Sequence, residues 1–255
     1  MIGAGTISPY AAALFDAFSE QPSSELAGLI NRAFIGMGTA GITPKLDLLY
    51  VPAVHDNDDA KLNWITPGTS SLTENGSIVW TAGVGYTGNG SDAYATTGVG
   101  PGSVASQNNH AFGAWVLTDQ NESAPVWGTN DTVGTACAAF VRPRSTGNFQ
   151  AVSAATTAGT DTQASAIGFS AVSRQAAGTF RMFRNAGAAV SKSVTTTAWP
   201  DTTWDILRRG GSGDNYSTAT VGMVFRSSGL TDGEMAAMYT IWAAYFAAIN
   251  TFTFA

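Results

Sequence analysis

The chain has 255 residues, enough for one large all-β domain with additional elements or for two small domains. Hydrophobic residues make up 44% of it and charged residues only 12%, about half the usual share, while 29 glycines supply turns. The formal net charge is −6 and no run of Lys or Arg occurs, which argues against nucleic acid as a partner. The single cysteine, Cys137, excludes an internal disulfide and a cysteine-based metal cluster.

The first residues, MIGAGTISPYAAALF, carry no positive charge ahead of their short apolar run, so we expect no secretory signal peptide. No segment approaches the ~20 apolar residues that are needed to span a bilayer. We therefore expect no membrane insertion and synthesis in a cytoplasm without an export signal.

Two short helices are predicted within residues 1–43, ahead of Pro44. The first begins at the N-cap signal Ser8-Pro9, and the second begins near Ser23 or Ser24 and can end at Gly38 or Gly41. Each helix has one apolar face. The apolar residues are Leu14, Phe15 and Phe18 in the first helix, and Leu26, Leu29, Ile30, Ala33, Phe34 and Met37 in the second.

Two helices of this length cannot form a core alone, so their apolar faces must be covered by something else. We expect residues 1–43 to be an N-terminal attachment segment and residues 44–255 to be a β domain. Packing of the same helices on that β domain is the open alternative. The residues expected to contact a partner or another copy of the chain are Leu14, Phe15, Phe18, Leu26, Leu29 and Phe34.

Short strands at a spacing of about 8 to 12 residues predict an antiparallel sandwich after Pro44. The first, Leu48 to Val54, is almost wholly apolar, so we expect it to be buried on both faces. No fixed-period repeat occurs, which argues against a propeller or a solenoid. Further strands are expected at residues 78–82, 94–97, 110–118, 124–128, 136–141, 148–153, 164–173, 179–184, 188–194, 204–208 and 219–226.

A final helix is predicted over residues 231–249. Thr231 and Glu234 fit a capping box, in which each side chain accepts from the backbone of the other. An apolar stripe then indicates a helix docked on the sheet. The stripe consists of Met235, Met238, Trp242, Tyr245 and Ile249.

The densest acidic cluster runs from His55 to Asp59. A calcium loop would need a glycine to turn the backbone between its oxygen ligands, and this segment has none. We therefore interpret the cluster as a solvated turn, with a weak cation site as the alternative, and we predict no metal site and no cofactor.

Sugar-cleaving chemistry needs two carboxylates that flank the scissile bond. No Glu-x-Asp-x-Glu pattern occurs, and Asp119 and Glu122 fall three apart in an expected loop. The two histidines, His55 and His110, do not stand beside a convincing nucleophile in the sequence. We therefore predict no catalytic residue.

A glycan-binding surface needs exposed aromatic rings with polar groups nearby. The flexible segment from Gly210 to Tyr216 is the strongest candidate, because loops on rigid sandwiches carry function. For each tryptophan, burial between the sheets is the favoured interpretation, and a ligand contact is the alternative. The candidate ligand contacts are Trp127, Asn130, Asp214, Asn215 and Tyr216.

Several segments resemble those of a group of bacteriophage virion proteins. They are KLDLLY (45–50), AVHD (53–56), LNW (62–64), GYTGNGS (85–91) and LTDGE (230–234), and the resemblance covers roughly residues 24–249. Those proteins carry a concanavalin-A-like or laminin-G-like lectin domain behind N-terminal helices. The resemblance implies a mainly β, two-sheet antiparallel jelly-roll sandwich, with short N-terminal helices and a docked C-terminal helix.

The resemblance also implies a place on a phage particle, assembled in the host cytoplasm, as a tail fibre, spike, baseplate appendage or head decoration. Other virion proteins and further copies of the chain, most simply in a trimer, are then the expected partners. We expect the sandwich to attach to host surface polysaccharide. The alternatives are a capsid decoration protein without glycan binding and a glycan-cleaving enzyme.

Overall fold

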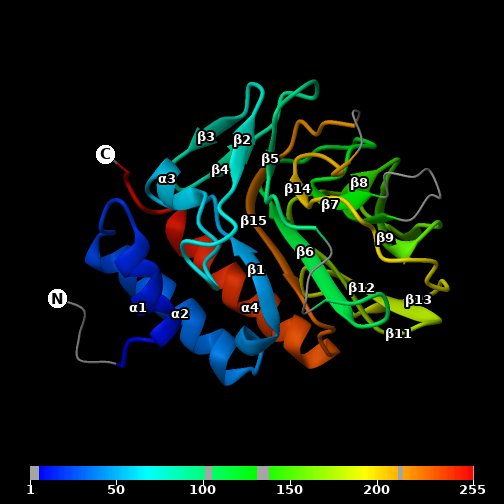
Figure 1. The fold of residues 1–255 in the computed structure, drawn as a ribbon, viewed down its shortest axis with the longest axis horizontal. Helices are drawn as coiled ribbons and strands as arrows, with labels where there is room; N and C mark the ends of the chain where they lie inside the picture. The colour runs from blue at the N-terminus through cyan, green and yellow to red at the C-terminus, as the bar shows by residue number, and fades with distance from the viewer. Residues whose placement is uncertain (1–5, 101–104, 131–137, 212–214, 255) are drawn as a thin grey trace.

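The computed structural model describes residues 6–100, 105–130, 138–211 and 215–254. These residues form three layers: helices, an eight-stranded sheet (sheet A) and a seven-stranded sheet (sheet B). The long helices are α1 (Pro9–Ala17), α2 (Ser24–Thr39) and α4 (Asp232–Ile249). Figure 1 shows α1 and α2 on one side of the molecule and β7 (Trp127–Asn130), β8 (Ala138–Ser145) and β9 (Asn148–Ala155) of sheet B on the other. The predicted antiparallel sandwich with added helices is therefore confirmed.

Sheet A is the middle layer, and its strands pair antiparallel. The strands are β1 (Leu46–Tyr50), β3 (Val79–Thr81), β4 (Gly85–Thr87), β6 (His110–Val116), β11 (Gly168–Ala176), β12 (Thr179–Arg184), β13 (Val190–Ser193) and β15 (Thr220–Ser227). Their order is β13-β12-β11-β6-β15-β4-β3, with β1 paired to β15. Strand β6 is buried on both faces: the Phe112 ring lies 5.0 Å from that of Trp204, which directly precedes β14 (Asp205–Ile206) of sheet B, while the Trp115 ring stacks on Phe246 of α4 at 4.7 Å.

Sheet B has the order β10-β9-β8-β7-β14-β5-β2. Its inner face packs on sheet A, and its outer face points away from the helices. Side chains on the inner face, among them Trp127, Val141 and Phe149, belong to the main core. The strands are β2 (Thr73–Asn75), β5 (Tyr94–Thr96), β7 (Trp127–Asn130), β8 (Ala138–Ser145), β9 (Asn148–Ala155), β10 (Gly159–Thr162) and β14 (Asp205–Ile206).

The C-terminal helix begins as predicted. Thr231 accepts from the Glu234 amide, and the Glu234 carboxylate accepts from the Thr231 amide, which completes the capping box. All five residues of the predicted stripe are buried against the rest of the chain. The longest helix of the described segments is not apolar enough over its length to cross a membrane.

Helices α1 and α2 pack on the rest of this chain rather than standing apart from it. Ile241 of α4 fits against Gly36 of α2, and the Phe34 ring lies 6.1 Å from that of Trp64. Of the six residues expected to contact a partner, Phe15 is partly buried and the others are at most 7% exposed. They therefore do not form a free attachment surface, because the core of the same chain covers them. The five buried residues are Leu14, Phe18, Leu26, Leu29 and Phe34.

The strand expected over Leu48 to Val54 is shifted toward the N-terminus. A 3-10 turn, η1 (Thr43–Lys45), leads into β1, which ends at Tyr50. Pro52 has no amide hydrogen to continue the ladder, so the following residues stay buried without regular pairing.

The acidic cluster is not a solvated turn. Asp56 caps the short helix α3 (Asn57–Ala60) by accepting from the Asp58 and Asp59 amides. The Asp59 side chain is buried and accepts from the amide and hydroxyl of Ser19, which fixes the end of α1. Burial raises the pKa of Asp59. No group of three or more His, Cys, Asp or Glu side chains in the described ranges is placed to hold a metal ion.

Candidate functional site

The outer face of sheet B is built by strict alternation along its strands. In β8, Ala139 and Val141 belong to the core between the sheets, so Phe140 and Arg142 point to the outer face. In β5, Ala95 points inward and its neighbour Tyr94 points outward. Cationic and aromatic side chains therefore lie on the same side of the sheet.

Strand pairing brings these residues into one row. Arg142 in β8 lies opposite Gln150 in β9, and β14 pairs with both β7 and β5. The chain leaves β14 at Ile206 and continues into Arg208 and Arg209, between β8 and β5. We call the resulting surface the arginine–tyrosine row, and it consists of Arg142, Arg209, Arg208, Tyr94 and Tyr216.

Arg208 is held rigidly at the centre of the row. Its Nε and Nη2 donate to the Asp205 carboxylate at 2.9 and 2.5 Å, and its guanidinium carbon lies 3.5 Å from the Tyr94 ring centroid. Asp205 is fully buried beneath it. Burial raises the pKa of Asp205, and the bonds from Arg208 oppose that rise. The position of Arg208 is therefore set by the protein before any ligand arrives.

Tyr216 closes one end of the row. Its ring centroid lies 6.0 Å from that of Tyr94, and the Arg208 guanidinium lies 5.7 Å from its centroid. The chain just after Tyr216 is anchored, because the Glu122 carboxylate accepts from the Ser217 hydroxyl and from the Thr218 amide and hydroxyl. Tyr216 thus stands half-buried on a fixed support, at the end of a loop.

Arg142 occupies the other end of the row. Its guanidinium carbon lies 4.4 Å from the Phe140 ring centroid, and that of Arg209 lies 5.8 Å from the same centroid. Burial, together with the neighbouring charge of Arg209, lowers the pKa of Arg142 to about 10. Within the described ranges no carboxylate lies within ion-pair distance of Arg142, and its hydrogen bond to Gln150 Oε1 is long, at 3.4 Å.

The structure corrects the prediction for Trp127. Its side chain is fully buried, its Nε1 donates to the Phe225 carbonyl at 3.0 Å, and its ring packs 5.0 Å from Trp204. Alternation in β7 points Trp127 toward sheet A, so it cannot present a face to a sugar. The aromatic residue that does reach the outer face nearby is Tyr94.

Of the other predicted ligand contacts, some lie at the arginine–tyrosine row and some do not. Tyr216 lies in the row, and Asn215 beside it is exposed with a positive φ of 70°. Asn130 is half-buried at the far end of β7, where its backbone is bonded to Thr202. Asp214 lies outside the described residues. Sequence reasoning missed Tyr94, Arg142 and Arg208, because only sheet pairing brings them together.

The sequence places no nucleophile next to His110, but the fold brings a hydroxyl from another strand to it. The Ser153 hydroxyl lies 2.7 Å from His110 Nε2, and His110 Nδ1 donates to the Ser106 carbonyl, also at 2.7 Å. Both side chains are fully buried between the sheets, where a substrate cannot reach them. Burial lowers the pKa of His110 to about 3, so the ring stays neutral. The contacts of His110 with Ser153 and Ser106 therefore belong to the core between the sheets.

The two loop carboxylates considered for sugar cleavage also serve the fold. Asp119 pairs with Arg144 at 3.1 Å and accepts from the Ala166 amide. Glu122 anchors the chain after Tyr216, as described above. Each carboxylate thus holds a separate loop in place.

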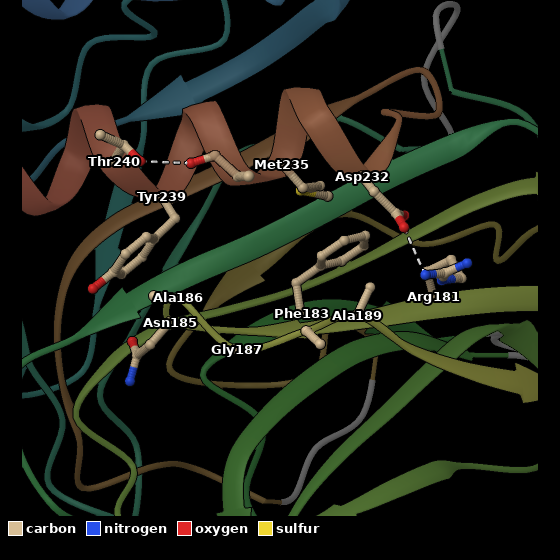
Figure 2. Close-up of a pocket in the computed structure, with 12 residues that line it drawn as sticks. Arg181, Phe183, Asn185, Ala186, Gly187, Ala189, Asp232, Met235, Tyr239 and Thr240 are labelled. Carbon is tan, nitrogen blue, oxygen red and sulfur yellow. Dashed lines mark hydrogen bonds and ion pairs between the residues drawn. The ribbon is translucent and has the colours of Figure 1, made fainter.

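A second concave surface lies between α4 and the β12–β13 hairpin. Figure 2 shows Tyr239 and Met235 of α4 facing Phe183 across it, and its volume is about 460 Å³. The Arg181–Asp232 ion pair, at 2.6 Å, closes one end. Asn185 at the other end is already bonded to the Phe169 amide. This groove is mainly apolar, and its charged side chains, Arg181 and Asp232, are bonded to each other, so the arginine–tyrosine row is the better candidate for a polar ligand.

Several solved structures have a similar fold. Domain 4 of an extracellular GH43 arabinanase from Geobacillus stearothermophilus, solved with arabinotriose, is 14% identical at a TM-score of 0.51, over 76% of this chain and 98% of that domain. A mutant Trypanosoma rangeli sialidase with trans-sialidase activity is 12% identical at a TM-score of 0.60, over 87% of this chain and 39% of that one. The receptor-binding domain of a botulinum neurotoxin C/D mosaic is 10% identical at a TM-score of 0.53, over 78% of this chain and 52% of that one.

No protein-family profile matches the sequence, and no curated protein matches it either. At these identities the structural likeness concerns the fold alone. The chain shares its β-sandwich architecture with an arabinanase domain solved with arabinotriose, with part of a sialidase and with part of a toxin receptor-binding domain.

Proposed function

We propose that this chain is a non-catalytic glycan-binding protein, and that the arginine–tyrosine row on the outer face of sheet B is its binding surface. The observation that carries the proposal is the fixed stack of Arg208 on Tyr94, with the half-exposed Tyr216 ring beside it. This is an aromatic surface with polar donors already in place on a rigid sheet.

Sugar recognition uses both properties of such a surface. The C–H faces of a sugar ring pack on aromatic side chains, while its hydroxyl groups need fixed polar partners. Arg208 is immobilised by Asp205 and Tyr94, so little conformational entropy is lost when it binds. The buried Trp127 contributes only the support beneath the sheet.

The structural neighbours agree with this function without specifying it. One is a domain solved with arabinotriose, and another is a receptor-binding domain. The sialidases are the reason to consider an enzyme, but the Ser153–His110 contact here is enclosed and the Asp119 and Glu122 carboxylates hold loops.

The proposed setting is a phage particle, and it rests on the sequence resemblance. There the chain would act as a tail fibre, spike or decoration, bound to other virion proteins, as a homo-oligomer with a trimer favoured. Its role would be attachment to host surface polysaccharide. Ile7 and Ile35 on the helical side are 42% and 45% exposed, which favours contacts there and keeps a decoration role without glycan binding as the second candidate.

The proposal is tested by screening the full chain on an array of bacterial and plant polysaccharides that includes arabinan. We expect Tyr216→Ala to weaken binding about tenfold, because it removes the stacking ring, and Tyr216→Phe to retain it. Circular dichroism checks that both variants are folded. Binding that is equal for the Ala and Phe variants would place the glycan elsewhere, and binding to no glycan would favour the decoration role.

A further inference from the structure

We infer that the ligand of the arginine–tyrosine row is an acidic polysaccharide, whose carboxylate or sulfate groups are bound by Arg142. This inference rests on the proposed glycan-binding function and specifies its ligand class. The supporting observation is that Arg142 differs from the other basic side chains in its bonding partners.

Half of the twelve Lys and Arg side chains, all of which the structure describes, form an ion pair with an acidic side chain that it also describes. The cations paired with carboxylates are Lys45, Lys61, Arg144, Arg181, Arg208 and Arg226. Arg174 and Arg184 are instead bonded to backbone carbonyls at normal distances. Arg142 differs from both groups, because among the described residues it has no carboxylate within ion-pair distance and its hydrogen bond to Gln150 is 3.4 Å long.

Unused donors on a half-buried cation point to an anionic ligand. Burial without a partner costs free energy, which an incoming carboxylate or sulfate would recover by accepting from the guanidinium. The Phe140 ring supports Arg142 from below at 4.4 Å. Arg209 adds a second positive charge close by, which repels Arg142 in the free protein and attracts an anion.

The length of the row favours a chain of sugars over a single small anion. From β8 through β7 and β14 to β5 there are three strand spacings, or about 14 Å, which is the length of a few sugar units. Along that distance the surface changes from Arg142 at one end to the Tyr94–Tyr216 pair at the other. One end therefore suits a charged group and the other suits a sugar face.

Dense polyanions suit the surface less well. Nucleic acid presents a negative charge every ~1.7 Å of duplex, and the chain as a whole carries a net charge of −6. An acidic polysaccharide with one charge on each sugar or on every second sugar meets the two ends of the row without a continuous line of charge. The spacing of charge thus favours an acidic polysaccharide over nucleic acid.

The test compares three polymers with the same sugar backbone: dextran, carboxymethyl dextran and dextran sulfate, each presented to the full chain by affinity electrophoresis. An oligo-dT of matched length is the fourth probe. Measurements are made at about 20 mM and about 200 mM NaCl, since an ionic contact weakens with salt. The variants are Arg142→Gln and, as a matched control, Arg32→Gln, which removes an exposed charge from α2 on the other side of the molecule.

We expect a charged dextran to bind at least about tenfold more tightly than dextran at low salt, and Arg142→Gln to remove most of that difference. Arg32→Gln should change the affinity less than about twofold. Equal binding of charged and uncharged dextran, lost in Tyr216→Ala, would overturn the acidic ligand while keeping glycan binding. Charged-dextran binding that responds equally to both arginine substitutions, or tighter binding of oligo-dT, would also overturn the inference.

Discussion

Arg174 and Arg142 are a matched pair on opposite sides of sheet B. Neither has a carboxylate partner within the described residues, and burial lowers the pKa of each to about 10. Arg174 lies between the sheets and donates to five neutral acceptors: the carbonyls of Ala176, Ala177, Val194 and Ser153, and the Ser153 hydroxyl. Arg142 lies on the outer face, and its hydrogen bond within the described part of the chain is a long one to Gln150.

The difference shows that a lowered pKa alone does not identify an arginine that binds a ligand. A buried cation that is saturated by carbonyls ties segments of the chain together, and its cost of burial is offset within the fold. For a cation with unused donors, the free-energy cost of burial is not offset until a ligand binds. The number and length of the hydrogen bonds, more than the pKa, therefore distinguish a structural arginine from a ligand-binding one.

The largest expected effect concerns the core beneath the outer face. Trp127→Ala should lower the free energy of unfolding by about 3–5 kcal/mol, because it leaves a cavity between the sheets and frees the Phe225 carbonyl. Urea unfolding followed by fluorescence measures the change. Tyr216→Ala is the matched outer-face variant and should cost less than about 1 kcal/mol. A small loss in Trp127→Ala would mean that the residue is not core.

The next largest effect is the difference in stability between variants of Arg174 and of Arg142. Arg174→Leu should lower the free energy of unfolding by at least about 3 kcal/mol, since several buried carbonyls lose their donor. Arg142→Leu should change it by less than about 0.5 kcal/mol, because few contacts are lost and the charge that is removed is half-buried and has no carboxylate partner in the described residues. Similar losses in the two variants, measured by urea unfolding, would contradict the distinction drawn here.

The smallest effect is a dependence of stability on pH. The pKa of His110 is about 3 in the folded chain and about 6.5 when the chain is unfolded, so below pH 6.5 the unfolded state binds more protons. Stability is then complete above about pH 6.5 and falls as the pH is lowered, by about 2 kcal/mol at pH 5. Urea unfolding at several pH values between 7 and 5 measures the slope.

His110→Gln is the control for that slope. Glutamine can keep one of the hydrogen bonds to Ser106 and Ser153 and does not titrate, so the slope between pH 7 and pH 5 should largely disappear. The absolute stability of the variant does not enter the comparison. An unchanged slope would assign the pH dependence to other groups.

Much of the fold could be predicted because it is specified locally. The capping box of Thr231 and Glu234 defines the start of α4, and β12 has the predicted bounds, Thr179–Arg184. The burial of Asp59 could not be predicted, because its partner, Ser19, lies forty residues earlier. The packing of α1 and α2 on this chain was one of two alternatives, since an apolar face does not reveal what covers it.

The candidate site was harder to predict for a geometric reason. Tyr216 was found because it follows a glycine-rich loop, which is a local signal. Trp127 was misassigned because a short strand shows which residues share a face without showing which face meets the core. Arg142 and Arg208 are 66 positions apart in the chain, and β7 and β14 must be placed side by side before the two belong to one surface.

The position of the helical layer sets how this surface would be displayed. Helix α1 and the C-terminal end of α4 lie on the side of the molecule opposite β8 and β9 (Figure 1). Copies gathered through their helical sides would therefore hold their rows outward together. Weak binding at each row would then add up to strong adhesion on a repetitive polysaccharide, because the first contact raises the effective concentration for the next.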